Sequence, residues 1–233
     1  MRIAILGAMR EEITPFLKKF PNYTQEEVGG NTFYKIAYRE HELVLAYSKI
    51  GKVHSALSAS SMILKFGCEK LIFSGVAGGL NPKLKVGDLI IASKLCQYDV
   101  DITAFGHPLG FIPESSVYIY PDSQLNAIAQ EVAQQKGIAL MEGVIASGDS
   151  FVASSEKKKW LIKNFQADAV EMEGASVANV CHLLKVPFCI LRSISDSADG
   201  EADVSFDEFL EHAAQTSADF VEAMLEKLLP QFT

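Results

Sequence analysis

A short apolar run from Phe188 to Leu191 gives way at once to polar residues, and this change constrains the fold of the chain more than any other feature. The run has the length and composition of a fully buried β-strand. Arg192, Ser195 and Asp196 follow it. Because open α/β sheets bind ligands outside the carboxyl ends of their strands, a buried strand that carries these residues to that edge predicts a ligand site. The alternative is that Ser195 and Asp196 only cap the next turn.

The composition limits the classes of protein to which the chain can belong. Its 233 residues are 48% hydrophobic and 21% charged, which is sufficient for a large core, and no linker, repeat or low-complexity run divides them. We therefore expect one domain over residues 1–233. A formal net charge of -8 without a long Lys/Arg cluster argues against a nucleic acid as a partner. No apolar stretch is long enough for a membrane span or a signal peptide, so no membrane partner is expected.

The cysteines indicate buried thiols instead of a metal or disulfide framework. Cys68, Cys96, Cys181 and Cys189 form no CxxC pair, and three of them lie in apolar surroundings. Such thiols are typical of a reducing compartment, which predicts a cytoplasmic protein. Because the sequence has no cluster of His and Cys ligands, no metal and no organic cofactor is implied.

Two other expected strands also end at residues suited to a ligand. The strand Ile3–Leu6 leads into a helix that carries Glu12 in its first turn, where the carboxylate either complements the helix dipole or faces the ligand edge. The strand Lys70–Ser74 leads into Gly75–Gly79, a loop through which backbone amides can approach a ligand closely. Its glycines lack the spacing of a dinucleotide fingerprint, so the loop alone is a weak indication.

The remaining pattern indicates an α/β chain. Glu171 and Glu173 flank Met172 at the end of a strand, and extended alternation would put both carboxylates on one side. Pro15 predicts that the first helix begins late or bends. Further elements are expected as a hairpin over residues 32–37 and 43–47, a strand within 86–93, a strand from 143, helices over about 53–66, 123–136 and 175–184, and a long helix that opens at a capping box, Ser205–Glu208.

Four separated segments, each after an expected strand, resemble in their order the 5′-methylthioadenosine/S-adenosylhomocysteine nucleosidase family, the hydrolytic branch of the nucleoside phosphorylase superfamily. They are Gly7–Glu12, Ser74–Gly79, Val170–Gly174 and Arg192–Asp199. The resemblance covers nearly the whole chain. It implies a single-domain three-layer α/β sandwich, nucleoside phosphorylase-like, with a central mixed β-sheet flanked by helices. It also implies hydrolysis of the N-ribosidic bond of both nucleosides, with release of adenine.

The resemblance assigns the chemical roles to four residues. Asp196 would protonate the purine as it leaves, with Ser195 orienting it, and Glu12 would activate water on the opposite face of the sugar, with Arg192 nearby. Cleavage through an oxocarbenium-like sugar needs these functions. Asp196 would have to be protonated at neutral pH, far above its solution pKa of about 3.9. Burial and the neighbouring Glu12 and Glu173 would push its pKa in that direction.

The resemblance also implies a substrate pocket shared between two subunits. Phe151 would stack on adenine and the Val152 backbone would read its edge, while Glu173 would hold the ribose hydroxyls. The other residues that it places along the substrate are Met9, Ala77, Gly78, Glu171, Met172 and Phe206. Ile50, Phe105 and Pro113 resemble residues that enter the neighbouring subunit's pocket, which implies a homodimer. Val76 departs from the family, because many members have Ser there.

Three alternative functions remain open at this stage. A phosphorolytic nucleoside phosphorylase would need cations around a phosphate, whereas the glycine loop has no nearby Arg and Glu12 would repel the anion. Aminodeoxyfutalosine cleavage is the same reaction with a different 5′ group, and the sequence does not separate the two. A non-catalytic purine-binding protein would keep the pocket without turnover.

Overall fold

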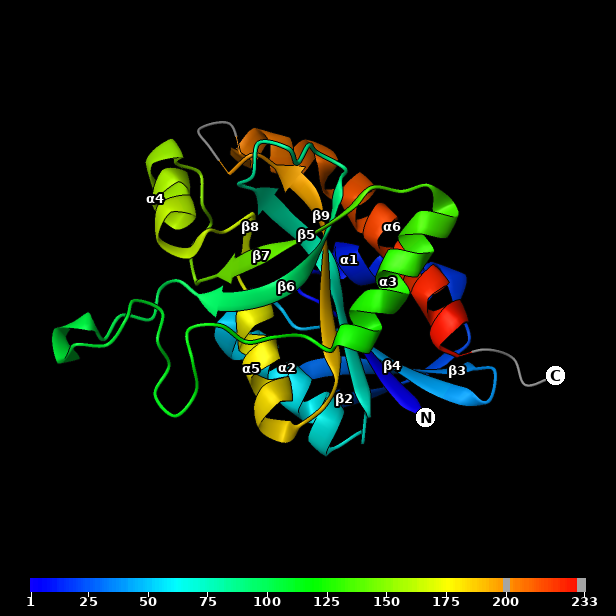
Figure 1. Ribbon diagram of the computed structural model, residues 1–233. Helices are drawn as coiled ribbons and strands as arrows, with labels where there is room; N and C mark the ends of the chain where they lie inside the picture. Colours follow the sequence, from blue (N-terminus) through cyan, green and yellow to red (C-terminus); the bar gives the residue numbers. More distant parts are fainter. Residues whose placement is uncertain (199–201, 230–233) are drawn as a thin grey trace.

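The computed structural model describes residues 1–198 and 202–229, and its centre is a nine-stranded mixed sheet (Figure 1). The strand order is β2-β3-β4-β1-β5-β8-β7-β6-β9, and β9 also pairs with β5. The last five strands therefore close on themselves, whereas β2, β3, β4 and β1 extend the sheet to one side. The strands are β1 (Arg2–Gly7), β2 (Tyr23–Val28), β3 (Asn31–Tyr38), β4 (His41–Tyr47), β5 (Lys70–Gly79), β6 (Leu89–Gln97), β7 (Leu140–Ser147), β8 (Ala169–Glu171) and β9 (Phe188–Asp196).

The pairing directions bring several strand ends to one edge of the sheet. β1 and β9 both pair with β5 in parallel, with Ile5 opposite Ile72 and Ile72 opposite Cys189. β2, β3 and β4 form an antiparallel meander that contains the predicted hairpin. The carboxyl ends of the three parallel strands β1, β5 and β9 thus lie side by side. Glu12 follows β1 and Asp196 ends β9, so both residues lie at this edge of the sheet.

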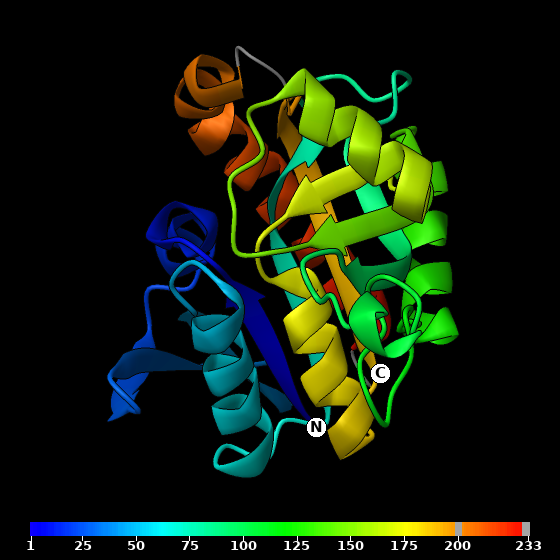
Figure 2. The same ribbon diagram turned by 90° about the vertical axis from the view of Figure 1, so that its left-hand side faces the viewer.

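Helices cover both faces of this sheet, which confirms the three-layer α/β architecture. Alternate residues of β1 face opposite ways: Ala4 and Leu6 belong to one apolar cluster, Ile3 and Ile5 to another. The first cluster includes residues of α2 and α5, which lie side by side on one face (Figure 2). The second includes residues of α1, α3 and α6. The helices are α1 (Arg10–Lys19), α2 (Lys52–Leu64), α3 (Ser123–Lys136), α4 (Ser155–Phe165), α5 (Gly174–Leu184) and α6 (Ala202–Leu228), with a short 3₁₀ turn, η1 (Thr103–Phe105).

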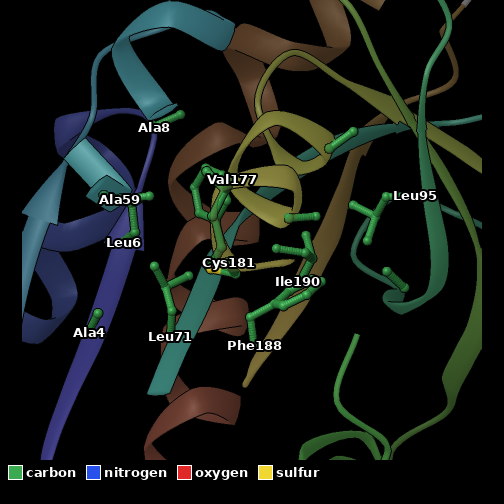
Figure 3. Close-up of a cluster of buried hydrophobic side chains, with 14 of the residues drawn as sticks. Ala4, Leu6, Ala8, Ala59, Leu71, Leu95, Val177, Cys181, Phe188 and Ile190 are labelled. Atoms are coloured by element: carbon green, nitrogen blue, oxygen red, sulfur yellow. The ribbon is translucent and has the colours of Figure 1, made fainter. Parts of the chain in front are cut away.

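Apolar packing holds α5 against the amino-terminal halves of β5 and β9. Figure 3 shows Val177 and Cys181 of α5 among Leu71 of β5 and Ile190 of β9. These side chains are fully buried, and each large one contributes about 1.5–3 kcal/mol on removal from water. The N-terminal end of α5, which follows Glu173, is thereby held against the sheet.

One predicted helix start is wrong, that of α6, whereas α1 begins at Arg10 and carries Glu12 in its first turn as predicted, with Pro15 inside the helix. The backbone carbonyl that this proline leaves without its usual donor belongs to Glu11, an exposed residue that water can reach. α6 begins at Ala202, so Ser205 lies within the helix and not at its N-cap. Asp199, the end of the fourth resembling segment, lies outside the described residues. Over the described part of the chain, no helix combines the length and the hydropathy that crossing a membrane requires.

Candidate active site

A cavity of about 340 Å³ opens at the shared edge of β1, β5 and β9. Glu12 reaches it from the first turn of α1, Ala77 and Gly78 from the end of β5, and Asp196 from the end of β9. Segments far apart in the sequence complete the wall. The lining residues are Ala8, Met9, Glu12, Ile50, Val76, Ala77, Gly78, Ser150, Phe151, Val152, Val170, Glu171, Met172, Glu173, Ser195, Asp196 and Phe206.

Most of the residues assigned by resemblance line this one cavity, but three do not. Arg192 is buried behind the wall, and Phe105 and Pro113 are exposed in the segment between β6 and α3, which projects from the body (Figure 1). Ile50 lines the cavity of its own chain. The resemblance had instead implied that Ile50 enters the pocket of a neighbouring subunit. The residues that sequence reasoning did not name are Ala8, Ser150 and Val170, whose small or apolar side chains give no chemical signal.

Glu12 is fixed by backbone donors from the turn between β1 and α1 and from β5. Its Oε2 accepts hydrogen bonds from the N–H groups of Ala8 (2.5 Å) and Met9 (2.9 Å), and its Oε1 accepts one from Val76 (2.9 Å). A Cβ on Gly75 would collide with this carboxylate, so only glycine leaves it room. Burial raises the pKa of Glu12, while Arg192 and the three N–H donors oppose that rise. The carboxyl group is therefore both desolvated and rigidly oriented.

Glu171 is occupied by the protein itself, although it borders the cavity. Its Oε2 accepts from Arg192 Nη2 (2.7 Å) and from the N–H groups of Gly174 (2.7 Å) and Glu173 (3.2 Å). Its Oε1 accepts from the Ser147 hydroxyl. Because β8 ends at Glu171 and the chain turns there, the extended alternation predicted for residues 171–173 is wrong. The carboxylate acts instead as a cap for the first N–H groups of α5.

Arg192 serves as the partner of Glu171 and makes no part of the cavity wall. Its guanidinium lies 4.0 Å over the ring of Phe73, and Nη1 donates to the carbonyl oxygens of Phe73 (3.2 Å) and Leu191 (3.1 Å). The ion pair with Glu171 is fully buried. Its effect on the site is electrostatic, since its positive charge favours the ionised form of Glu12 and of Glu173.

The Glu173 carboxyl group borders the cavity and, within the described part of the chain, accepts one backbone hydrogen bond. Its Oε1 accepts from the N–H of Gly51 (2.8 Å), which lies just before α2. Burial raises the pKa of Glu173 to about 8, and the negative charge of Glu171 adds to the rise. A carboxyl group in this state can donate as well as accept hydrogen bonds, which suits a pair of hydroxyls.

Asp196 is held by its own neighbours at the end of β9. The Ser195 hydroxyl donates to its Oδ2 (2.9 Å), and the N–H of Ala198 donates to its Oδ1 (2.7 Å). A Cβ on Gly78 would come within 2.8 Å of Oδ1, so the glycine in β5 allows the close approach. Asp196 is only 2% exposed, and it lines the cavity together with Ala77 and Gly78 of β5.

Two aromatic rings form an apolar part of the wall. Phe151 and Phe206 meet edge to face, with ring centroids 5.6 Å apart and an interplanar angle of 78°. Met9 and Ile50 also contribute apolar side chains. The cavity therefore combines buried carboxyl groups with an apolar region. Among the residues that the structure describes, no group of three or more His, Cys, Asp or Glu side chains could hold a metal ion.

Comparison with known proteins identifies the family of the chain. The model of the phosphorylase superfamily matches residues 2–226. The aminodeoxyfutalosine nucleosidase of Helicobacter pylori strain ATCC 700392 / 26695 is 58% identical over 97% of this chain and 99% of its own length. The 5′-methylthioadenosine/S-adenosylhomocysteine nucleosidase of Bacillus cereus strain G9842 is 40% identical over 98% of this chain and its own full length (100%).

Solved structures agree equally well. The crystal structure of an Asp-to-Asn variant of the Helicobacter pylori nucleosidase, with 5′-methylthioadenosine in its active site, superposes with a TM-score of 0.96 at 56% identity over 97% of this chain and 98% of that chain. The chain belongs to the family of 5′-methylthioadenosine/S-adenosylhomocysteine and aminodeoxyfutalosine nucleosidases within the phosphorylase superfamily, which confirms the resemblance.

Proposed function

We propose that this protein hydrolyses the N-ribosidic bond of 5′-methylthioadenosine and S-adenosylhomocysteine, releasing adenine and the 5′-thioribose sugar. The observation that carries the proposal is the set of buried carboxyl groups, Glu12, Glu173 and Asp196, around one cavity with an apolar end. Over the described residues, the wall of that cavity contains no Lys, Arg or His. A phosphate would meet carboxylates without a facing cation, which favours water as the nucleophile over phosphorolysis.

Asp196 and Ser195 act on the leaving purine. Protonation of the ring nitrogen as the bond breaks turns adenine into a good leaving group. The carboxylate that forms when Asp196 gives up its proton is stabilised by the Ser195 hydroxyl and the Ala198 N–H, both already in place. No reorganisation is needed at the moment of proton transfer.

Glu12 acts on the water and Glu173 on the sugar. Desolvation makes the Glu12 carboxylate a stronger base, and the three N–H donors keep it pointed at one place. Glu173 binds the ribose hydroxyls, and Met172 lines the sugar. Arg192 lies behind the cavity wall, and its positive charge lowers the pKa of Glu12 and of Glu173. Water that Glu12 activates then attacks the oxocarbenium-like carbon.

The apolar side chains of the cavity contact the adenine base at one end of the substrate and the 5′-thioether at the other. Phe151 stacks on adenine, and the Val152 backbone reads the edge of the base. Met9, Ile50 and Phe206 contact the 5′-thioether, where each buried CH₂ contributes about 0.8 kcal/mol. Val76 adds a further apolar contact in place of a hydroxyl.

A second activity is favoured by the Helicobacter pylori relative named as an aminodeoxyfutalosine nucleosidase. Its cleavage is the same reaction on a nucleoside with a different 5′ group. The carboxyl groups act at the base and the ribose, so a change of the 5′ group leaves the reacting atoms and the residues proposed to act on them unchanged. We include aminodeoxyfutalosine among the substrates of this site.

The exposed apolar residues support a homodimer. Val53 is 77% exposed on α2 and Phe105 is 81% exposed in η1, and Ile50 and Leu57 are half-exposed beside Val53. Such a patch is typical of an interface. Phe105 and Pro113 of one subunit would then approach the other's cavity. The cytoplasmic location and the single domain over residues 1–233 stay predictions from the sequence.

The test is adenine release from three nucleosides: 5′-methylthioadenosine, S-adenosylhomocysteine and aminodeoxyfutalosine. Each is incubated with the protein in phosphate-free buffer and in buffer with phosphate. We expect equal rates in both buffers and a reducing sugar as the second product. Strict dependence on phosphate would make the protein a phosphorylase, and adenine binding without release would make it a binding protein.

A further inference from the structure

Lys158 of α4 bridges two strand ends just outside the cavity. Its Nζ donates to the carbonyl oxygen of Gly79 (3.0 Å), at the end of β5, and to that of Ser197 (2.6 Å), just after β9. Asp196 lies opposite Gly78 in the β5–β9 ladder, whose register shifts between Ala77 and Gly78. The ammonium group thus joins β5 to the residue after β9 at the point where the regular pairing of these two strands stops.

The second of these bonds bears directly on Asp196. The carbonyl of Ser197 and the N–H of Ala198 belong to one planar trans peptide, so they point in opposite directions. The carbonyl end of this peptide receives Lys158 Nζ, and its N–H end donates to Asp196 Oδ1 (2.7 Å). Any rotation of the peptide away from Lys158 also moves the donor away from the Asp196 carboxyl group.

The backbone at Ala198 has an unfavourable conformation that contacts from elsewhere in the chain must stabilise. Ala198 has a φ of 49°, in the left-handed region that residues other than glycine seldom adopt, and it is fully buried. A charge-assisted hydrogen bond is roughly twice as strong as a neutral one, and it also polarises the peptide so that its N–H becomes a better donor. Lys158 therefore both fixes the strained peptide and strengthens its bond to Asp196.

We propose that Lys158 is a positioning residue for the proposed general acid, acting through the Ser197–Ala198 peptide on Asp196. The inference rests on the proposed function. Its contribution is made when Asp196 becomes negative, which is the moment of proton transfer to the purine. It therefore affects turnover more than it affects substrate binding.

The experiment compares the steady-state kinetics of adenine release for the wild type and four variants. Lys158→Met removes the donor and keeps most of the side-chain length, Lys158→Gln removes only the charge, and Lys158→Arg restores a cation. Lys159→Met is the matched control, because Lys159 is an exposed lysine of the same helix. We expect Lys158→Met and Lys158→Gln to lower kcat at least about 10-fold with KM within about 3-fold. Lys158→Arg should recover most of the loss, and Lys159→Met should match the wild type.

Several results would overturn this role. They are an unchanged kcat in both neutral variants, an increase in KM alone, an equal loss in Lys159→Met, or no recovery in Lys158→Arg. Circular dichroism identifies any variant that fails to fold, and if Lys158→Met does so, the pair Lys158→Gln and Lys158→Arg decides the question. A wild type that releases no adenine would overturn the proposed function and this role together, whereas an active wild type beside unaffected variants overturns the role alone.

Discussion

Three glutamates share the site, and their partners separate their roles. Glu12 accepts three backbone N–H bonds, Glu171 is paired with Arg192, and Glu173 has one N–H donor and faces Glu171. Donors and cations favour the ionised form of a carboxyl group, whereas burial and a nearby carboxylate favour the neutral form. These three environments match the proposed roles of Glu12 as the base and Glu173 as a hydrogen-bonding group for the sugar, and they leave Glu171 as the partner of Arg192.

The raised pKa of Glu173 predicts a pH-dependent stability. Its folded pKa of about 8 exceeds the ordinary value of 4.5, so the folded protein binds the proton more tightly than the unfolded chain does. This contribution to the free energy of unfolding is complete below pH 4.5 and is lost as the pH rises towards 8. Glu173→Gln stays neutral and keeps an acceptor for the Gly51 N–H. Melting curves without substrate should show the Tm of the variant gaining about 3 °C or more on the wild type between pH 5 and pH 8. Parallel Tm profiles for the two proteins would contradict this.

Asp196→Asn tests the acid. The asparagine oxygen can still accept from Ala198, so we expect a folded protein with a Tm close to that of the wild type. Turnover should fall by about 10²–10⁴-fold, since the amide cannot deliver a proton to the purine. Adenine release and circular dichroism are the measurements. Near-normal turnover would remove Asp196 from the mechanism.

At the level of elements, the turn between β8 and α5 connects the site to the core. Glu171 caps the N–H groups of Glu173 and Gly174, and the Ser147 hydroxyl accepts from the N–H of Ala175 (2.7 Å). A Cβ at position 174 would come within 3.1 Å of the Glu171 carboxylate oxygens, so steric crowding explains why this position is occupied by glycine. Side chains from other strands thus satisfy the start of α5 and place Glu173.

Glu171→Ala should therefore destabilise the whole protein. It leaves Arg192 buried without its carboxylate, a change that costs about 3–5 kcal/mol of unfolding free energy. The control is Glu26→Ala, which removes solvent-exposed ion pairs with Lys35 and Lys65 and should leave the free energy of unfolding almost unchanged. Urea unfolding measures both. Equal losses in the two variants would contradict the structural role of Glu171.

The elements that the sequence predicted are those with a strong apolar pattern. β1, β5 and β9 are buried runs, and their parallel ends brought most of the predicted site together. β2 was missed because it is an edge strand with mostly exposed side chains. α4 was missed because a run of lysines precedes its two buried residues, Leu161 and Phe165.

The positions of Arg192 and Lys158 could not be predicted for a different reason. Their partners Glu171 and Ser197 lie far along the chain, and no local pattern reports such a contact.

At the level of the whole molecule, the apolar surface of α2 predicts association. Val53→Glu would place a charge in the proposed interface, and burying an unpaired carboxylate is unfavourable. We expect this variant to sediment as a monomer, with kcat/KM reduced at least about 10-fold if Phe105 completes the partner's cavity. Ile138→Glu, at an apolar position after α3 that is 38% exposed, should leave both properties unchanged. A monomeric wild type, or a fully active monomeric Val53→Glu, would contradict the shared cavity.

Water activated by Glu12 is the proposed nucleophile that attacks the sugar. The most direct measurement is mass spectrometry of the sugar formed from 5′-methylthioadenosine in H₂¹⁸O, with phosphate present. Adenine should appear together with a free methylthioribose that carries one ¹⁸O, and Glu12→Gln should suppress both products. A sugar 1-phosphate without ¹⁸O would show that phosphate is the nucleophile and would contradict the hydrolytic account.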